Sequence, residues 1–512
     1  MFEFLDPAAQ PLDIEHPFHR RQGGVERGDL RLTVQVHKAS GYRRAWCSDY
    51  HPRMRPYYVA VVGAGPSGYF AAASLLRFAD ESVAGGGADI HIDMLEMLPT
   101  PWGLVRSGVA PDHPKIKSVS RTFEKTGADP RFRFFGNIAV GRDVSADELA
   151  EHYDAVVYAV GTQSDRALGI PGEALPGSVA AVDFVGWYNA HPQFTEMAPD
   201  ISSGRAVVIG NGNVAVDVAR ILVTDPDVLA ATDIADHALD ALHQRGVAEV
   251  VVVGRRGPLQ GAFTTLELRE LGELEGVDVV VDPADLEGIT DEDATAAGKI
   301  TAANIKVLRG YADRTAAGHH REGNRRIVFR FRTSPIEITG NERVATIVLG
   351  RNELFTDEHG RNTAQDTGER ETLPAQLVVR AVGYRGVAIP GLPFDDRTAT
   401  IPHTKGRITG RDNDYVVGWI KRGPSGVIGT NKKDSQDTVD TLIADLGGMD
   451  LREVGPGYAN ELLDWLQTCQ PKLVTDDHWQ RIDAHERGAG EPHGRPRVKL
   501  ANVGDMLRIA HE

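Results

Sequence analysis

Short apolar runs, most of them followed by glycine, recur along this chain and predict the buried strands of a parallel α/β fold. Small and apolar residues over 69–78 predict a buried helix directly after the first run, and 213–222 repeats this arrangement after a later one. Strands that alternate with helices in this way indicate helices packed on a largely parallel sheet. The strands we predict are 58–62, 90–96, 132–136, 153–161, 206–209, 249–254 and 377–383.

Other stretches add elements to this pattern. A basic helix is expected over 115–125, inserted helices over 225–245, and helices over 264–271 and 434–446. Alternation of apolar and polar residues predicts further strands over 326–332 and 345–349. Two polar stretches, 312–325 and 357–370, are expected to be loops.

The first apolar run leads into a glycine pattern that suits a dinucleotide. Gly63, Gly65 and Gly68 have the spacing G-x-G-x-x-G between a strand and a helix. Gly63 would allow the tight turn, Gly65 would let the backbone approach a pyrophosphate, and Gly68 would let helix and strand pack closely. The helix N-terminus would then face the phosphates with its free N–H groups. A tight turn without a ligand is the alternative.

An acidic residue follows the second predicted strand, where this fold places a carboxylate against ribose hydroxyls. That residue is Glu96, and the glycine-rich stretch 84–88 lengthens the connection before it. A carboxylate here, without a basic neighbour, suits adenosine that lacks a 2′-phosphate, as in FAD or NAD. A solvated carboxylate at a strand end is the alternative.

The glycine pattern occurs a second time, with a different residue at the end of its second strand. Gly210 and Gly212 supply the turn, and Ala215 takes the third position, a permitted variant. The strand over 249–254 is followed by Arg255 and Arg256 instead of an acid. Guanidinium groups can bind a 2′-phosphate, so this site should prefer NADP(H) to NAD(H). Two such turns imply two bound dinucleotides.

The order of the motifs predicts one domain inserted in another. The stretch 377–383 echoes 156–161, and this pair brackets the second glycine motif. We therefore predict two Rossmann-like domains, one formed by 54–161 with 384–512 and one by 162–383. Residues 1–53 are polar and turn-rich, so they are expected to be a disordered extension or to lie upstream of a start at Met54.

Composition narrows the function further. The 512 residues carry a net charge of −16, which argues against binding to nucleic acid or to an anionic membrane surface. Cys47 and Cys469 are the only cysteines, too few for a disulfide framework, a thiol relay or a cysteine-ligated cluster. No apolar run reaches the length of about 18 residues that spans a bilayer. We expect a cytoplasmic protein without a metal site.

Three features could serve redox chemistry beside a flat ligand. The loop over 97–114 is rich in proline and glycine and ends near His113, which is either a polar group at the ligand or a structural histidine. Glu267 and Glu270 could orient the arginine pair, contact a nicotinamide, or lie on a solvated helix face. The glycine-rich turn over 415–430 precedes a helix whose N-terminus could stabilise negative charge on a reduced flavin.

Several of these motifs together resemble the adrenodoxin-reductase family, and within it the NADPH:ferredoxin reductases of mycobacterial type. The resemblance extends from about Met54 to the C-terminus and implies a glutathione-reductase-like flavoprotein that carries electrons between NADPH and ferredoxin through FAD. Residues 1–53 depart from the family pattern. The matching stretches are 63–68, 101–114, 212–220, 254–260, 418–426 and 479–483.

The resemblance also implies site residues. FAD contacts fall on Ser67, Glu96, Leu104, Val140, Trp419, Gly426, Val427 and Ile428, in addition to the first glycine turn. NADP contacts fall on Asn211, Gly212, Asn213, Val214, Arg255, Arg256, Glu267 and Gly426. His113 and Asp217 match polar residues near the flavin and are the candidate catalytic groups, and Arg269 is carried over as an acceptor-docking residue. The expected partner is ferredoxin, and the expected state is a monomer.

Two other functions stay open on the sequence alone. A flavin monooxygenase would couple NADPH oxidation to oxygenation of an organic substrate. A redox-sensing binding module would hold both nucleotides without turnover. The first would show tight coupling to its substrate, and the second would keep NADPH beside an oxidised flavin.

Overall fold

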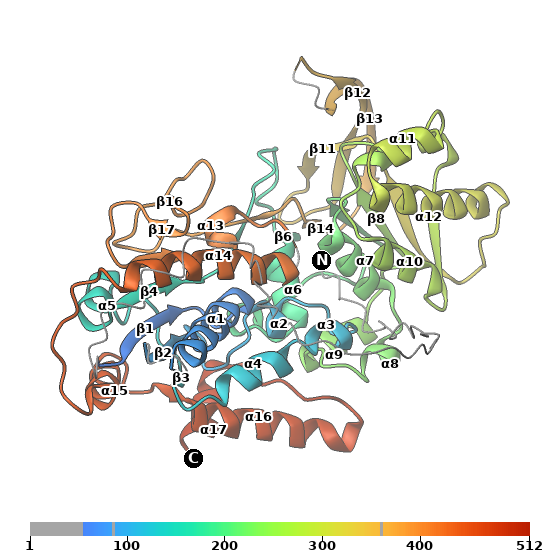
Figure 1. Cartoon of the computed structure of the whole chain (residues 1–512). Helices are drawn as coiled ribbons and strands as arrows, with labels where there is room; N and C mark the ends of the chain where they lie inside the picture. Colours follow the sequence, from blue (N-terminus) through green and yellow to red (C-terminus); the bar gives the residue numbers. More distant parts are fainter. Residues whose placement is uncertain (1–54, 84–87, 359–361, 427) are drawn as a thin grey trace, which may run out of the picture.

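A computed structural model gives the structure of this chain and describes residues 55–83, 88–358, 362–426 and 428–512. The predicted extension over 1–53 and the alternative start at Met54 lie outside the described residues. Figure 1 shows two sheet-based units side by side, with a long hairpin projecting from the second unit. None of the helices in the described ranges combines the length and apolar character needed to cross a bilayer.

The first sheet has parallel strands at its centre, and its strands come from both ends of the described chain. The central strand β1 is buried along its whole length, as its apolar run predicts. In sheet order the strands are β16 (His403–Thr404), β17 (Arg407–Ile408), β18 (Asp414–Val416), β4 (Ala155–Tyr158), β1 (Tyr57–Val62), β2 (Ile90–Leu95), β3 (Phe132–Gly136) and β19 (Val474–Thr475).

The second sheet uses only residues between 178 and 380. Its core strands β14, β7, β8, β10 and β9 all pair in parallel. In sheet order the strands are β6 (Ser178–Ala180), β14 (Leu377–Arg380), β7 (Arg205–Ile209), β8 (Glu249–Val253), β10 (Arg325–Arg330) and β9 (Val277–Val281). The strands of the first sheet thus flank those of the second in sequence, which agrees with two Rossmann-like units.

Two short strands join these units. β5 (Ser164–Asp165) leaves the first unit, β15 (Tyr384–Arg385) returns to it, and the two strands pair antiparallel. The two similar stretches 156–161 and 377–383 belong to different sheets, since β4 lies in the first sheet and β14 in the second. The boundaries at 161/162 and 383/384 stay a prediction.

Helices cover the faces of both sheets. α1 and α14 pack side by side on the first sheet, and α16 and α17 run along its lower side in Figure 1. The helices of the first unit are α1 (Pro66–Val83), α2 (Leu104–Ser107), α3 (Pro114–Lys117), α4 (Ser120–Gly127), α5 (Ala146–His152), α13 (Trp419–Arg422), α14 (Ile428–Leu446), α15 (Tyr458–Cys469), α16 (Asp476–Gly490) and α17 (Val503–His511). Those between β5 and β15 are α6 (Ala181–Tyr188), α7 (Asn213–Val223), α8 (Pro226–Leu229), α9 (Asp236–His243), α10 (Thr265–Glu270), α11 (Asp291–Ala296) and α12 (Lys299–Ala316).

Four local predictions differ from the structure in whole or in part. The loop over 97–114 contains α2, and the basic helix over 115–125 is divided between α3 and α4. The loop expected over 312–325 begins inside α12 and ends in β10. The stretch 357–370 is largely strand, because β13 (Asn362–Pro374) pairs with β12 (Thr346–Thr356), which in turn pairs with β11 (Thr333–Thr339). Most of β13 is exposed, so it carries no apolar face from which a strand could be predicted.

Candidate functional site

The first glycine turn lies at the carboxyl end of β1 and opens toward a cavity. Gly63 has a φ of +104°, and a Cβ there would lie 2.7 Å from the carbonyl oxygen of Ala159. A Cβ on Gly68 would lie 2.1 Å from the carbonyl oxygen of Gly63, so only glycine lets α1 pack this closely. No protein atom lies within 4 Å of a Cβ built on Gly65, which leaves that side open for a ligand.

The cavity at this turn has a volume of about 330 Å³ and contains most residues assigned to FAD from the sequence. Two of its lining residues carry a buried polar atom without a hydrogen-bond partner in the described part of the chain, Trp419 at Nε1 and Thr162 at Oγ1. Such orphaned atoms fit a site that receives a polar ligand. The predicted residues that line it are Gly63, Gly65, Ser67, Glu96, Leu104, Val140, Trp419 and Gly426.

Glu96 is buried at the end of β2 and supports the turn through its carboxylate. The N–H of Ala64 donates to Oε2 at 2.8 Å, and the N–H of Leu98 donates to Oε1 at 3.1 Å. Burial raises the pKa of Glu96, and these backbone donors oppose that effect. The carboxylate therefore links the glycine turn after β1 to the end of β2, and it also lines the cavity.

The second glycine turn lines a cavity of about 760 Å³ in the second unit. Gly210 has a φ of +143°, and a Cβ there would lie 2.3 Å from the carbonyl oxygen of Ala381. Arg255 and Arg256 line the same cavity, and in the described ranges neither forms an ion pair. Two guanidinium groups without carboxylate partners fit an anionic ligand. The predicted residues that line it are Gly210, Asn211, Gly212, Asn213, Val214, Arg255, Arg256 and Gly426.

The two cavities meet at a smaller one of about 50 Å³. Leu104 and Trp419 border it from the first cavity, and Asn213 and Val214 border it from the second. Tyr384, on the returning strand β15, lines all three. The two large cavities thus border the same small junction.

A buried charge cluster lies at the junction. His113 Nε2 is 3.3 Å from Glu267 Oε2 and 3.6 Å from Asp217 Oδ1. Arg220 contacts the same ring nitrogen and lies 2.9 Å from Asp217 Oδ1 and 3.3 Å from Glu267 Oε2. It also pairs with Asp112, at 2.6 Å and 2.9 Å. Two cations are thus surrounded by three carboxylates.

This arrangement shifts the pKa values of the cluster. Burial opposes the charged form of His113, but hydrogen bonds to Asp217 and Glu267 outweigh it and raise its pKa to about 9. Burial likewise opposes ionisation of Asp217, but Arg220 and His113 lower the pKa of this carboxyl to about 2. The junction therefore holds an imidazolium and a carboxylate together at neutral pH.

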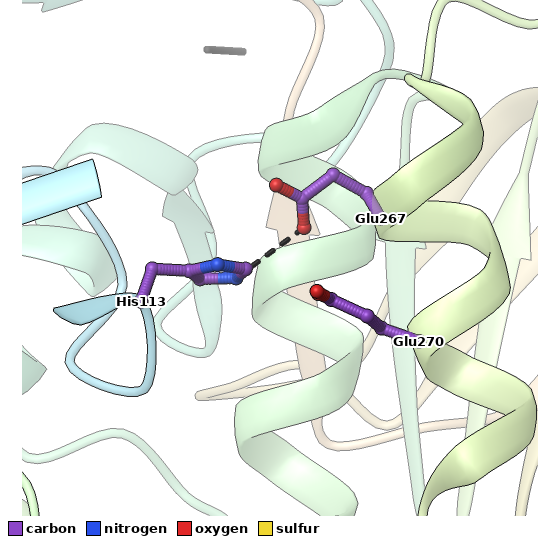
Figure 2. Close-up of side chains that lie close together, drawn as sticks. All are labelled: His113, Glu267 and Glu270. Carbon is purple, nitrogen blue, oxygen red and sulfur yellow. Dashed lines mark ion pairs between the residues drawn. The ribbon is translucent and has the colours of Figure 1, made fainter. Parts of the chain in front are cut away.

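Glu270 completes the acidic side of the cluster (Figure 2). One ligand-type atom each from His113, Glu267 and Glu270 lies within 4.8 Å of the others, a spacing at which a metal ion can be held. Arg220 contacts both His113 and Glu267. Its guanidinium therefore already supplies the positive charge that these side chains could otherwise take from a metal ion.

The structure corrects one reading of the acids on α10. Glu267 pairs with Arg220 and His113, and within the described ranges it forms no ion pair with Arg255 or Arg256. The interpretation that it orients the arginine pair was therefore wrong, whereas a role near the nicotinamide stays a prediction.

Sequence reasoning missed Arg220, Asp112, Tyr384 and Arg166. The last lines the second cavity, and Tyr384 lies at the junction. Arg220 could have been noticed as a second charged residue, one turn after Asp217, in the largely apolar helix α7. Asp112 and Tyr384 carry no comparable signal, because their partners are distant in sequence.

Four predicted residues remain: Gly68, Arg269, Val427 and Ile428. Val427 lies outside the described residues, and Ile428 is the first residue of α14. Arg269 is exposed on α10, outside all three cavities. Gly68 lies beneath the first turn and does not line the cavity.

The fold and the paired cavities define a dinucleotide-dependent oxidoreductase. The pyridine nucleotide-disulphide oxidoreductase family model matches residues 57–418, and the chain belongs to that family. It is 69% identical over 460 residues to the NADPH-ferredoxin reductase FprA of Mycobacterium tuberculosis (strain ATCC 25618 / H37Rv), covering 89% of this chain and 99% of that protein.

Two further comparisons agree. The mitochondrial NADPH:adrenodoxin oxidoreductase of Salvelinus fontinalis is 41% identical over 461 residues, covering 88% of this chain and 91% of that one. The solved structure of Mycobacterium tuberculosis FprA in complex with NADPH matches with a TM-score of 0.86 at 68% identity, covering 90% of this chain and all of that one. The chain therefore belongs to the family of these reductases, and the resemblance drawn from its motifs is confirmed.

Proposed function

We propose that this protein is an NADPH:ferredoxin reductase, a flavoprotein that moves electrons between NADPH and a ferredoxin through FAD. One observation carries the proposal: two dinucleotide-type cavities converge on a single junction lined by Tyr384. When bound, FAD supplies the conversion between two-electron and one-electron transfer. The protein's own residues hold the two nucleotides and set the charge around them.

The first cavity would hold FAD. The open side of Gly65 would admit the pyrophosphate at the N-terminus of α1, and Glu96 would accept from the ribose. The buried Nε1–H of Trp419, which has no partner in the described residues, would find an acceptor on the flavin. The assigned residues are Gly63, Gly65, Ser67, Gly68, Glu96, Leu104, Val140, Trp419, Gly426, Val427 and Ile428.

The second cavity would hold NADP(H). Its pyrophosphate would lie at the N-terminus of α7, and Arg255 and Arg256 would bind the 2′-phosphate. The assigned residues are Gly210, Asn211, Gly212, Asn213, Val214, Arg255, Arg256, Glu267 and Gly426.

His113 and Asp217 are assigned to the point where the reacting rings would meet. At neutral pH His113 would carry a proton on both ring nitrogens, and the ionised Asp217 would remain an acceptor. Together with Glu267 they would hold the polar end of a nicotinamide. They would also balance the charge that is transferred between the nucleotides.

Within the described residues, no thiol lines the cavities. Cys469 belongs to α15 and lines none of the three cavities, whereas Cys47 lies outside the described residues. This supports direct transfer to an iron–sulfur partner over reduction of a disulfide. We propose that the partner is ferredoxin, docked near Arg269, and that the protein acts as a cytoplasmic monomer.

An anaerobic titration tests the proposal. The purified protein should show a flavin spectrum that bleaches at far lower NADPH than NADH, and the reduced protein should then reduce an added ferredoxin. A protein without bound flavin, or one that reduces a disulfide but no ferredoxin, would contradict the proposal. Oxygenation coupled to an organic substrate would favour the monooxygenase, and bound NADPH beside an oxidised flavin would favour the redox sensor.

A further inference from the structure

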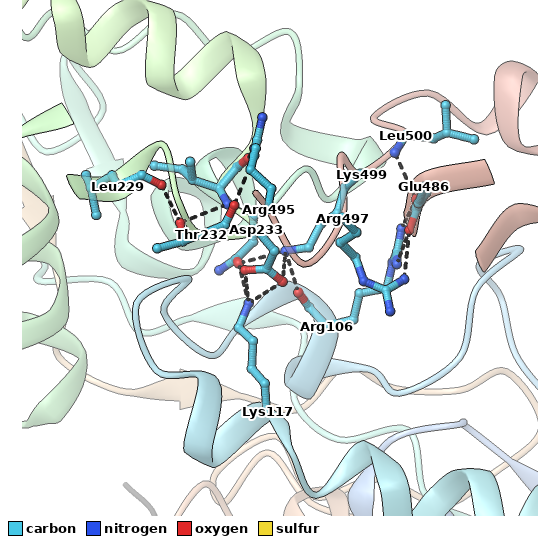
Figure 3. A network of polar contacts seen from close by, with 12 residues as sticks. Arg106, Lys117, Leu229, Thr232, Asp233, Glu486, Arg495, Arg497, Lys499 and Leu500 are labelled. Atoms are coloured by element: carbon cyan, nitrogen blue, oxygen red, sulfur yellow. Dashed lines mark hydrogen bonds and ion pairs between the residues drawn. The ribbon is translucent and has the colours of Figure 1, made fainter. Parts of the chain in front are cut away.

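A second charge cluster, largely buried, joins three distant parts of the chain (Figure 3). Lys499, near the C-terminus, has a side chain that is 1% exposed. Its Nζ lies 3.1 Å from Asp233 Oδ2, donates to the carbonyl oxygen of Arg106 at 3.0 Å and donates to Asn189 Oδ1 at 3.1 Å. Lys117 Nζ contacts both carboxylate oxygens of Asp233, at 2.7 Å and 2.8 Å.

The partners of Lys499 belong to both units. Arg106 and Lys117 lie in α2 and α3 of the first unit, whereas Asn189 follows α6 and Asp233 precedes α9 in the second. Arg495 adds contacts on the same side, because its guanidinium donates to the carbonyl oxygen of Thr232 at 3.0 Å and to that of Ile234. We call residues 495–499 the C-terminal strap, since they fasten the segment over 232–234 to the first unit.

The same cluster contacts α2 and α3, the two short helices beside the junction. α2 begins at Leu104, which lines the first cavity and the junction. α3 begins directly after His113, its N-cap residue, and ends at Lys117. Each of these helices has a single turn of four residues, too short to hold its own position. Their orientation must come from contacts at their ends.

The charges in this cluster restrict where its side chains can lie. Two ammonium groups, the buried Lys499 and the partly buried Lys117, share one carboxylate, Asp233. Burial lowers the pKa of Lys499, and Asp233 opposes that effect. A buried ion without a partner is costly, so both lysines are restricted to positions that keep Asp233 between them.

We propose that Lys499 and Asp233 are positioning residues for hydride transfer, and that the C-terminal strap sets how the second nucleotide approaches the first. The inference rests on the proposed function. A misplacement of about 1 Å far from the reacting atoms can slow a reaction roughly hundredfold. Loss of the strap should therefore affect the transfer step more than the binding of either nucleotide.

The test uses the full chain with bound flavin and the variant Lys499→Met, which is one atom shorter than lysine and removes its charge. We expect flavin bleaching by NADPH to slow roughly ten- to hundredfold, with NADPH affinity within about threefold of the parent. With NADPH deuterated at the transferred position, the kinetic isotope effect should increase, because the transfer step becomes limiting. Asp233→Asn should act in the same way, and the double variant should be little slower than either single one.

Arg481→Met is the matched control, because Arg481 donates to the carbonyl oxygen of Ala510 within the first unit and does not reach the second. It should lower thermal stability without slowing bleaching. If Lys499→Met does not yield folded protein, Asp233→Asn decides in its place. Bleaching as fast as in the parent, an unchanged isotope effect, or a loss equal to that of the control would overturn the inference. If the parent itself fails to bleach with NADPH, the proposed function fails instead.

Discussion

Arg106 and Glu486 form a buried bidentate ion pair although 380 residues separate them in sequence. The guanidinium is 4% exposed and the carboxylate is fully buried. Arg497 also donates to Glu486, at 3.0 Å, and the N–H of Leu500 donates to it at 2.8 Å. The C-terminal part of the chain is thereby fixed to the one-turn helix beside the first cavity.

Glu486→Gln should therefore destabilise the protein by about 3–5 kcal/mol, because the buried guanidinium of Arg106 would lose its anion and Arg497 would keep only Asp483. Burial opposes ionisation of Glu486, but Arg106 and Arg497 lower its pKa. The pair's contribution is thus present above the ordinary pKa of 4.5 and is lost as the pH falls through the lowered value. Denaturant unfolding across acidic pH measures this, with Glu512→Gln, an exposed partner of Arg508, as the control. A loss no larger than that of the control would contradict the prediction.

His113 should make stability fall on the alkaline side. Its pKa rises from 6.5 to about 9 in the folded protein, so its contribution is complete below 6.5 and is lost as the pH rises through 9. The shift corresponds to roughly 3 kcal/mol. His113→Gln should flatten the stability curve between pH 6.5 and 9, measured by urea unfolding, and the exposed His243→Gln should leave it unchanged. A variant curve parallel to that of the parent would show that His113 is neutral in the folded state.

Gly68 should tolerate no side chain. A Cβ would meet the carbonyl oxygen of Gly63 at 2.1 Å, so Gly68→Ala must push α1 away from the glycine turn. We expect the purified variant to contain little flavin and to unfold at a lower temperature. Gly127→Ala in α4 is the control, because no atom lies within 4 Å of its Cβ, and it should keep both flavin and stability. Normal flavin content in Gly68→Ala would contradict the assigned packing role.

Much of the fold follows from local patterns, whereas parts of the site do not. Strands such as β1 and β8 are continuous apolar runs, and both glycine turns have a fixed spacing, so they could be predicted. β13 could not, since both of its faces are largely exposed, and α2 and α3 are too short to show helical periodicity. Contacts such as Arg220 with Asp112 join residues 108 positions apart, which no local pattern reports.

The arginine pair should decide between NADPH and NADH. Arg255 and Arg256 line the second cavity and form no ion pair in the described ranges, so both can bind the 2′-phosphate. A hydrogen bond to a charged group contributes about 1.5–3 kcal/mol, or roughly tenfold or more for each residue. Changing both to Ala should raise the KM for NADPH by about hundredfold and leave that for NADH nearly unchanged, measured by steady-state ferredoxin reduction. The exposed pair Arg487 and Arg508, changed to Ala together, controls for net charge and should alter neither KM. Equal losses with NADPH and NADH would show that the arginines support the cavity without recognising the 2′-phosphate.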